Sequence, residues 1–126
     1  MPSTTRGPGR IRSCHATSAA AASAFVGRAA IARLNQRYLR HRGETDVLSF
    51  GFTSGGKRSA IIGDIYICPD VARLNARNQG VSASEELLRL VVHGTLHVLG
   101  YDHPSGEARM KSPMWIRQEK IVARLV

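Results

Sequence analysis

The chain has 126 residues, five histidines and a formal net charge of +9 at pH 7. That length suits one domain with one hydrophobic core, and no apolar run approaches the roughly eighteen residues of a membrane span, so we expect no membrane partner. The two cysteines, Cys14 and Cys68, show no metal or redox spacing. We therefore expect free thiols in a reducing compartment.

The positive charge gathers at the start of the chain. Residues 1–42 contain eight arginines and no acidic residue, whereas acids and bases nearly balance in the remainder. A basic segment favours a polyanionic partner, because each neutralised phosphate releases counterions. A merely solvated basic tail is the alternative interpretation.

Residues 1–24 combine arginine, proline, glycine, serine and alanine. This composition predicts a basic segment that is disordered or targeting-like, followed by a single metallohydrolase domain over residues 25–126. A transit peptide, a secretory signal and an atypical start all remain open for the first segment, although its alanine and serine run is weakly apolar for a secretory signal.

Two kinds of periodicity mark the next part of the chain. Apolar residues recur at helical spacing from Ser23 to about Arg40, which predicts an amphipathic surface helix. Residues 45–52 alternate in the manner of a strand, and residues 61–68 are rich in β-branched side chains, which predicts a second strand after a flexible loop at 54–57. Asp64 inside that apolar strand is either a paired structural group or an active-site group. One face of the first strand would carry Val47, Ser49 and Gly51, and the other Leu48, Phe50 and Phe52.

Helices are predicted in the second half of the chain. Pro69 begins one that runs to about Arg77, and Gly80 ends it. Ser112 and Pro113 begin the last helix, in which Trp115 belongs to the core or a lid, or offers a platform for base stacking.

The helix between these two carries the most informative residues. Ser82 and Glu85 fit a capping box at its start. Its apolar stripe consists of Leu87, Leu88, Val91, Val92, Leu96 and Leu99. Gly100 falls where the helix would stop, because glycine takes a left-handed conformation there at little cost.

Three histidines lie within the eleven residues HGTLHVLGYDH. His93 and His97 are four residues apart, so a helix presents both on one face, and the turn at Gly100 would return His103 toward them. A lone histidine on an apolar helix is usually a packed core residue, but three at this spacing are hard to explain by packing. Three imidazoles leave a fourth position for water, which is the layout of a catalytic zinc site.

The neighbours of these histidines refine the prediction. Asp102 is either an acceptor that fixes a histidine tautomer or a turn residue. The spacing also matches that of the metzincin proteases, whose motif carries a glutamate directly after the first histidine as the general base. Here that position is Gly94, so a protease would lack its base, and metal-assisted hydrolysis of another bond is favoured.

The eleven residues resemble the H-G-x-L-H-x-x-G-Y-D-H motif of the YbeY family of metal-dependent endoribonucleases. The resemblance extends over about residues 31–126 and includes the TDVLSF segment at 45–50 and the GDI segment at 63–65. It implies an α/β (α+β) fold with a small mixed sheet packed against helices, and a metal site on a helix and the following loop. Three departures are that Leu39 stands where the family commonly has arginine, that Glu44 replaces a proline, and that the family's amino-terminal strands are not recognisable in residues 1–30.

The resemblance also implies a function. His93, His97 and His103 would bind a zinc-like ion, and the enzyme would cut single-stranded RNA in the cytoplasm, notably ribosomal RNA at the 3′ end of the small subunit. Arg40, or else Arg42, is predicted to steady the phosphate, since a guanidinium binds phosphate in bidentate fashion. The alternatives are an RNA- or ribosome-binding factor with a structural metal, and a zinc-dependent hydrolase or protease.

Overall fold

The computed structural model describes residues 18–53 and 60–126, and the structural statements that follow concern these residues. The predicted loop at 54–57, Cys14 and most of the segment 1–24 lie outside them. In chain order the elements are β1 (Ser18–Phe25), α1 (Arg28–Leu39), β2 (Val47–Thr53), β3 (Ala60–Ile67), α2 (Pro69–Gln79), α3 (Ala83–Val98), the 3-10 helix η2 (Gly106–Lys111) and α4 (Pro113–Leu125).

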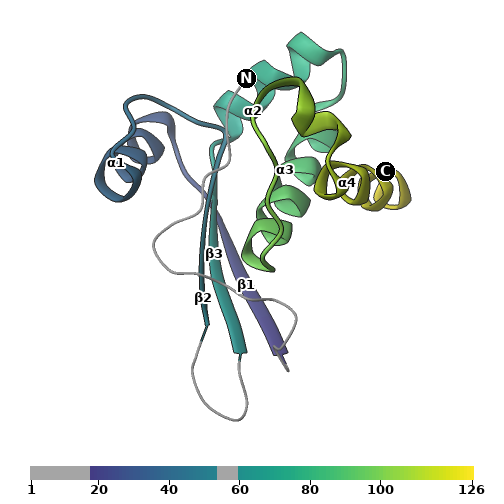
Figure 1. Cartoon of the computed structure of the whole chain (residues 1–126). Helices are drawn as coiled ribbons and strands as arrows, with labels where there is room; N and C mark the ends of the chain where they lie inside the picture. Colours follow the sequence, from purple (N-terminus) through teal and green to yellow (C-terminus); the bar gives the residue numbers. More distant parts are fainter. Residues whose placement is uncertain (1–17, 54–59) are drawn as a thin grey trace.

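The strands form a mixed sheet in the order β1-β3-β2, with β3 in the centre (Figure 1). β1 runs parallel to β3 and β2 runs antiparallel to it. Helices pack on this sheet, which confirms the small mixed sheet and the α+β class expected from the resemblance.

β1 corrects two expectations about the start of the chain. Residues 18–24 belong to a strand, although a disordered or targeting-like segment was expected over 1–24, and the first helix begins at Arg28 rather than near Ser23. Alanine and serine carry little local strand preference, so the segment gives no strand signal of its own. Backbone pairing along β3, from Ala60 to Ile67, makes it a strand. One strand therefore precedes the first helix, where we expected none.

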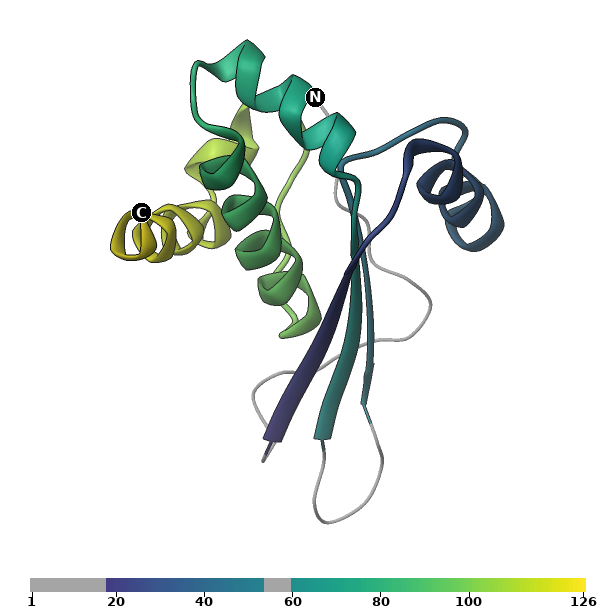
Figure 2. The ribbon, with the colours of Figure 1, turned by 180° about the vertical axis from the view of Figure 1, so that it is seen from behind.

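The two faces of the sheet carry different layers. Figures 1 and 2 show α1 on one side and α2, α3 and α4 on the other. Val47, Ile61 and Ile65 pack against residues of α2 and α3, whereas Leu48 and Phe50 pack against α1. The alternation predicted along residues 45–52 is confirmed, because successive side chains of a strand point to opposite faces.

Local signals place most helix ends where they were expected. Gly80 follows α2 with φ +71°, and the Ser82 hydroxyl caps α3 by accepting a hydrogen bond from the Glu85 backbone N–H at 3.1 Å. The Ser112 hydroxyl caps α4 in the same way. Residues 106–111 form η2, which was not predicted.

Two smaller findings complete the fold. Cys68 is a buried free cysteine. Among the described residues, no helix has both the length and the apolar character needed to cross a bilayer.

Candidate metal centre

The close approach of α3 to β3 sets the position of the site. A Cβ atom built on Gly94 would lie 2.8 Å from Cγ2 of Ile65, so any side chain there would push the helix off the sheet. Gly63 on β3 plays the reciprocal part, since its Cβ would lie 2.4 Å from Cγ1 of Val98. Glycine on each element therefore lets α3 lie tightly on the sheet, with His93 and His97 buried beside the contact.

The turn after α3 brings in the third histidine. α3 ends at Val98 with Leu99 as its cap, Gly100 has φ +104°, and the Tyr101 N–H donates to the Leu96 carbonyl at 3.0 Å. This positive φ is the conformation that the sequence predicted for Gly100, and it reverses the chain.

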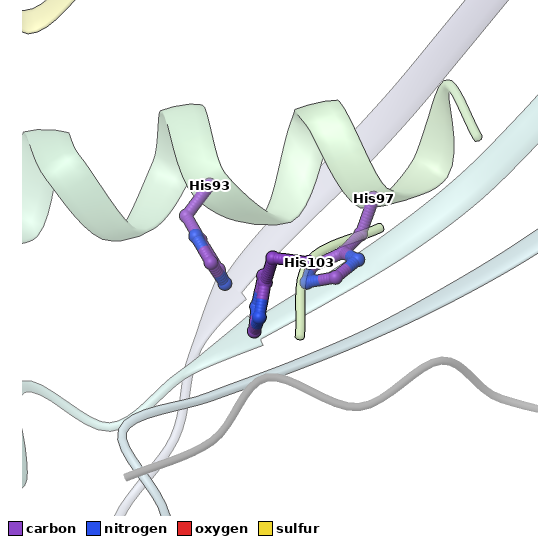
Figure 3. Close-up of side chains that lie close together, drawn as sticks. All are labelled: His93, His97 and His103. Carbon is purple, nitrogen blue, oxygen red and sulfur yellow. The ribbon is translucent and has the colours of Figure 1, made fainter. Parts of the chain in front are cut away.

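The three imidazoles converge (Figure 3). The ring centroids of His93 and His97 are 4.7 Å apart, and those of His103 lie 5.1 Å from His93 and 5.0 Å from His97. One nitrogen from each ring falls within 4.8 Å of the others, so the three could hold a metal ion. The predicted convergence is confirmed.

Hydrogen bonds orient the three rings alike. Nδ1 of His93 faces the side-chain oxygen of Gln118 at 2.5 Å. Nδ1 of His97 faces the carbonyl of Tyr101, and Nδ1 of His103 faces that of Pro104, both at 3.0 Å. An oxygen acceptor requires the proton on Nδ1, and in the neutral imidazole this leaves Nε2 with its lone pair. The Nε2 atom of His103 is buried without a hydrogen-bond partner in the described part of the chain.

This donor set fits a metal ion. A buried nitrogen lone pair with no hydrogen bond is costly unless it meets a cation or a proton donor. Three neutral imidazoles with room for another ligand are typical of catalytic zinc, whereas structural zinc is usually closed by four protein ligands. His93, His97 and His103 are therefore the residues that would hold the ion.

The electrostatics of His93 favour the same form. Burial lowers the pKa of His93 to about 4, and the charges of His103 and Arg109 add to this, while the hydrogen bond with Gln118 opposes it. The imidazole is therefore neutral at pH 7, which is the state in which histidine binds metal.

Gln118 is a residue of the site that sequence analysis missed. Its side chain is 1% exposed, and its amide nitrogen donates to Glu119 at 2.9 Å while its oxygen faces His93. Glu119 in turn accepts two hydrogen bonds from Arg89 at 3.0 Å. A polar residue at 118, between Met114 and Val122 on the buried face of α4, is the signal that would have identified it.

Asp102 lies close to His97 at the edge of the site. Its Oδ1 is 3.6 Å from Nδ1 of His97, beyond hydrogen-bond distance, and its side chain is 64% exposed. The Tyr101 carbonyl is the nearer acceptor for that Nδ1 atom. The turn thus orients His97 mainly through its backbone.

Other residues singled out in the sequence lie elsewhere. Arg40 is the exposed cap at the end of α1, with φ +55°, and α1 lies on the sheet face opposite α3 (Figure 2). Asp64 is exposed and lines a pocket beside α1. Trp115 is half-buried, with the guanidinium of Arg109 5.1 Å above its ring. Arg109 also lies close enough to His93 for its charge to lower the pKa of that imidazole, so it is a cation of the site region that sequence analysis did not single out.

Comparisons with known proteins agree with this geometry. The family described as endoribonuclease YbeY matches residues 15–126. The endoribonuclease YbeY of Chlorobaculum tepidum is 39% identical over 101 residues, covering 80% of this chain and 70% of that protein. Those of Chlorobaculum parvum and Frankia alni are 40% and 41% identical, and cover 68% and 79% of this chain.

A solved structure is also similar. The solution structure of TM1509 from Thermotoga maritima has a TM-score of 0.57 at 32% identity, covering 83% of this chain and 67% of that one. The chain spans between 59% and 70% of the length of the three relatives. Since the family match covers nearly the whole chain and includes all three histidines, this chain belongs to the YbeY endoribonuclease family.

Proposed function

We propose that the chain is a zinc-dependent endoribonuclease that cuts single-stranded RNA. Its substrate would be ribosomal RNA at the 3′ end of the small subunit, within ribosome maturation and quality control in the cytoplasm. The observation that carries the proposal is the convergence of three histidines whose Nδ1 atoms face oxygen acceptors and whose Nε2 atoms are left for a metal.

The residues of the chain would prepare the site in three ways. A zinc ion bound there supplies a Lewis acid that activates water near neutral pH. Gln118 keeps the proton of His93 on Nδ1, and burial keeps that imidazole neutral. Arg109 contributes positive charge close enough to lower the pKa of His93, and positive charge favours a phosphate. The role of Arg40 in steadying the phosphate stays a prediction.

A specific observation favours the rival proposal of an RNA-binding factor with a structural metal. Leu39, at the position where the family commonly has arginine, packs against the cluster of Ile31, Leu48 and Phe50. It supplies neither a charge nor a hydrogen bond to a substrate. This rival predicts RNA or ribosome binding that survives loss of the metal, with no cleavage.

The protease alternative meets a steric obstacle. A glutamate at position 94 would have to fit where even a Cβ atom comes within 2.8 Å of Ile65. The general base of the metzincin motif therefore has no room in this packing.

Cleavage of a single-stranded RNA by the full chain tests the proposal. The parent is compared with His97→Ala and with His41→Ala, which removes an exposed imidazole outside the cluster. We expect the parent and His41→Ala to bind zinc and to cut, and His97→Ala to lose both. Chelation should stop cleavage, and equal cleavage by all three proteins would point to contaminating ribonuclease and refute the assignment.

A further inference from the structure

A second pocket lies on the sheet face opposite the histidines. Its volume is about 190 Å³, and it is lined by Leu34, Tyr38, Phe50, Phe52, Asp64 and Tyr66. Ile65, the next residue of β3, contacts Gly94 on the other face, so the sheet separates this pocket from the metal centre. The volume is small compared with drug-sized sites and suits a single planar ring system.

Aromatic rings form the walls of this pocket. The ring centroids of Tyr38 and Phe50 are 5.5 Å apart and those of Phe50 and Tyr66 are 6.0 Å apart, both edge to face. Tyr38 and Phe52 are each 47% exposed, so their rings are available to a ligand. Exposed rings around a small hollow are suited to stacking on another flat ring.

One carboxylate lies among these rings. Asp64 is exposed, and across the sheet its register partners are Phe50 on β2 and Ala22 on β1. Within residues 18–53 and 60–126, no donor forms a hydrogen bond or ion pair with its carboxylate. Ala22, the neighbour of Asp64 on β1, has a short side chain. The pocket thus combines aromatic walls, on which a ring can stack, with a carboxylate that can accept hydrogen bonds from a ligand.

The hydrogen-bonding capacity of the Asp64 carboxylate favours one kind of nucleobase. An ionised carboxylate offers two oxygens and no donor. Guanine presents two adjacent donors, N1–H and N2–H, on its Watson–Crick edge, whereas adenine and cytosine pair one donor with an acceptor and uracil places its single donor between two carbonyls. We propose that this pocket binds a guanine base, stacked on the aromatic rings and paired through N1–H and N2–H with the Asp64 carboxylate.

The surroundings of the pocket suit a guanine that belongs to RNA. The guanidinium of Arg37 lies 5.4 Å from the centroid of the Tyr38 ring, and Arg33 is exposed on the same helix. These cations favour the phosphates that flank a stacked base. The inference rests on the proposed function for its ligand class, and it gives the protein a base-specific contact away from the metal centre.

Binding of nucleoside 5′-monophosphates to the full metal-loaded chain tests this inference. These ligands have no internucleotide bond to cut, and all four carry the same phosphate, so a contact with the metal contributes equally to each. Isothermal titration should show GMP bound about tenfold more tightly than AMP, CMP or UMP, the discrimination of one good bidentate contact. Four equal affinities would overturn the inference.

Variants locate the contact in the pocket. Asp64→Asn should abolish the preference for GMP and shift it toward AMP and CMP, because an amide offers one acceptor and one donor. Phe52→Ala should weaken binding of all four nucleotides, since stacking is tolerant of base identity. Asp70→Asn makes the same charge change on α2 and should keep the GMP preference. A preference that persists in Asp64→Asn would refute the assignment.

The result of the nucleotide-binding test can be distinguished from the result of the RNA-cleavage test of the proposed function. RNA cleavage without a GMP preference would reject only the guanine pocket. A GMP preference without RNA cleavage would reject the nuclease and leave a guanine-binding module.

Discussion

Replacing Gln118 with methionine tests whether the hydrogen bond behind His93 orients the metal site. Methionine has a similar length and fills the same buried space, but it offers only a weak acceptor to the Nδ1–H group. In the structure the Gln118 oxygen lies 2.5 Å from that nitrogen, and the side chain is 1% exposed, so water cannot replace it.

The magnitude follows from this burial. A buried donor left without its partner costs about 1–3 kcal/mol, and loss of an acceptor behind a metal-binding histidine typically weakens metal affinity about 10–100-fold. These two ranges agree, since about 1.4 kcal/mol corresponds to a factor of ten. We therefore expect the zinc affinity of Gln118→Met to fall by about 10–100-fold.

The assay is competition for zinc against a chromophoric chelator at pH 7.5, combined with urea denaturation of the metal-free protein. Gln118→Glu keeps an oxygen for His93 but loses the donor to Glu119, so it should retain zinc affinity better than Gln118→Met and still lose stability. Val122→Ala is the control for packing, because Val122 is buried on the same face of α4. If Gln118→Met binds zinc as the parent does, or no worse than Val122→Ala, the hydrogen bond does not orient the ring.

Two further predictions concern stability. Burial and the charge of Glu86 raise the pKa of Asp46 from 3.8 to about 6, so the ionised group costs the folded state about 3 kcal/mol at pH 7. This cost is absent below about pH 4 and grows as the pH rises through 6. In urea denaturation, the free energy of unfolding of Asp46→Asn relative to that of the parent should therefore rise by up to about 3 kcal/mol between pH 4 and pH 7. A difference that does not depend on pH would contradict the cause given. Gly94→Ala should lower the free energy of unfolding by about 1–3 kcal/mol, because the new methyl group would meet Ile65 at 2.8 Å, and an unchanged denaturation midpoint would show that α3 is not held as tightly as described.

The features of the fold that depend on local signals were predictable from the sequence. The caps at Ser82 and Ser112, the glycine after α2 and the alternation along residues 45–52 act through the backbone or through neighbours within a few residues. The spacing of His93 and His97 likewise places both rings on one helical face before any tertiary contact is known. Caps and periodicity depend on residues three or four apart, so they can be recognised in the sequence without knowledge of tertiary contacts.

Contacts between residues far apart in the chain determined the features that the sequence did not predict. β1 is a strand because its backbone pairs with β3, about forty residues later, although its alanines favour no strand. Gln118 belongs to the site because α4 packs on α3, and 25 residues separate it from His93. The fold also explains Gly94, whose lack of a side chain was read as a missing catalytic base and proves to be required for helix-to-sheet contact.

The sequence by itself determined the three histidines, the helix that carries two of them and the glycine turn that returns the third, because the chemistry and the spacing lie within eleven residues. Only the tertiary structure decided that Gln118 lies behind His93 and fixes which nitrogen of that ring is left for a metal, and which face of the sheet Asp64 shares with the aromatic rings. Both depend on partners that meet through packing between elements distant in the chain, and such contacts leave little trace in local patterns.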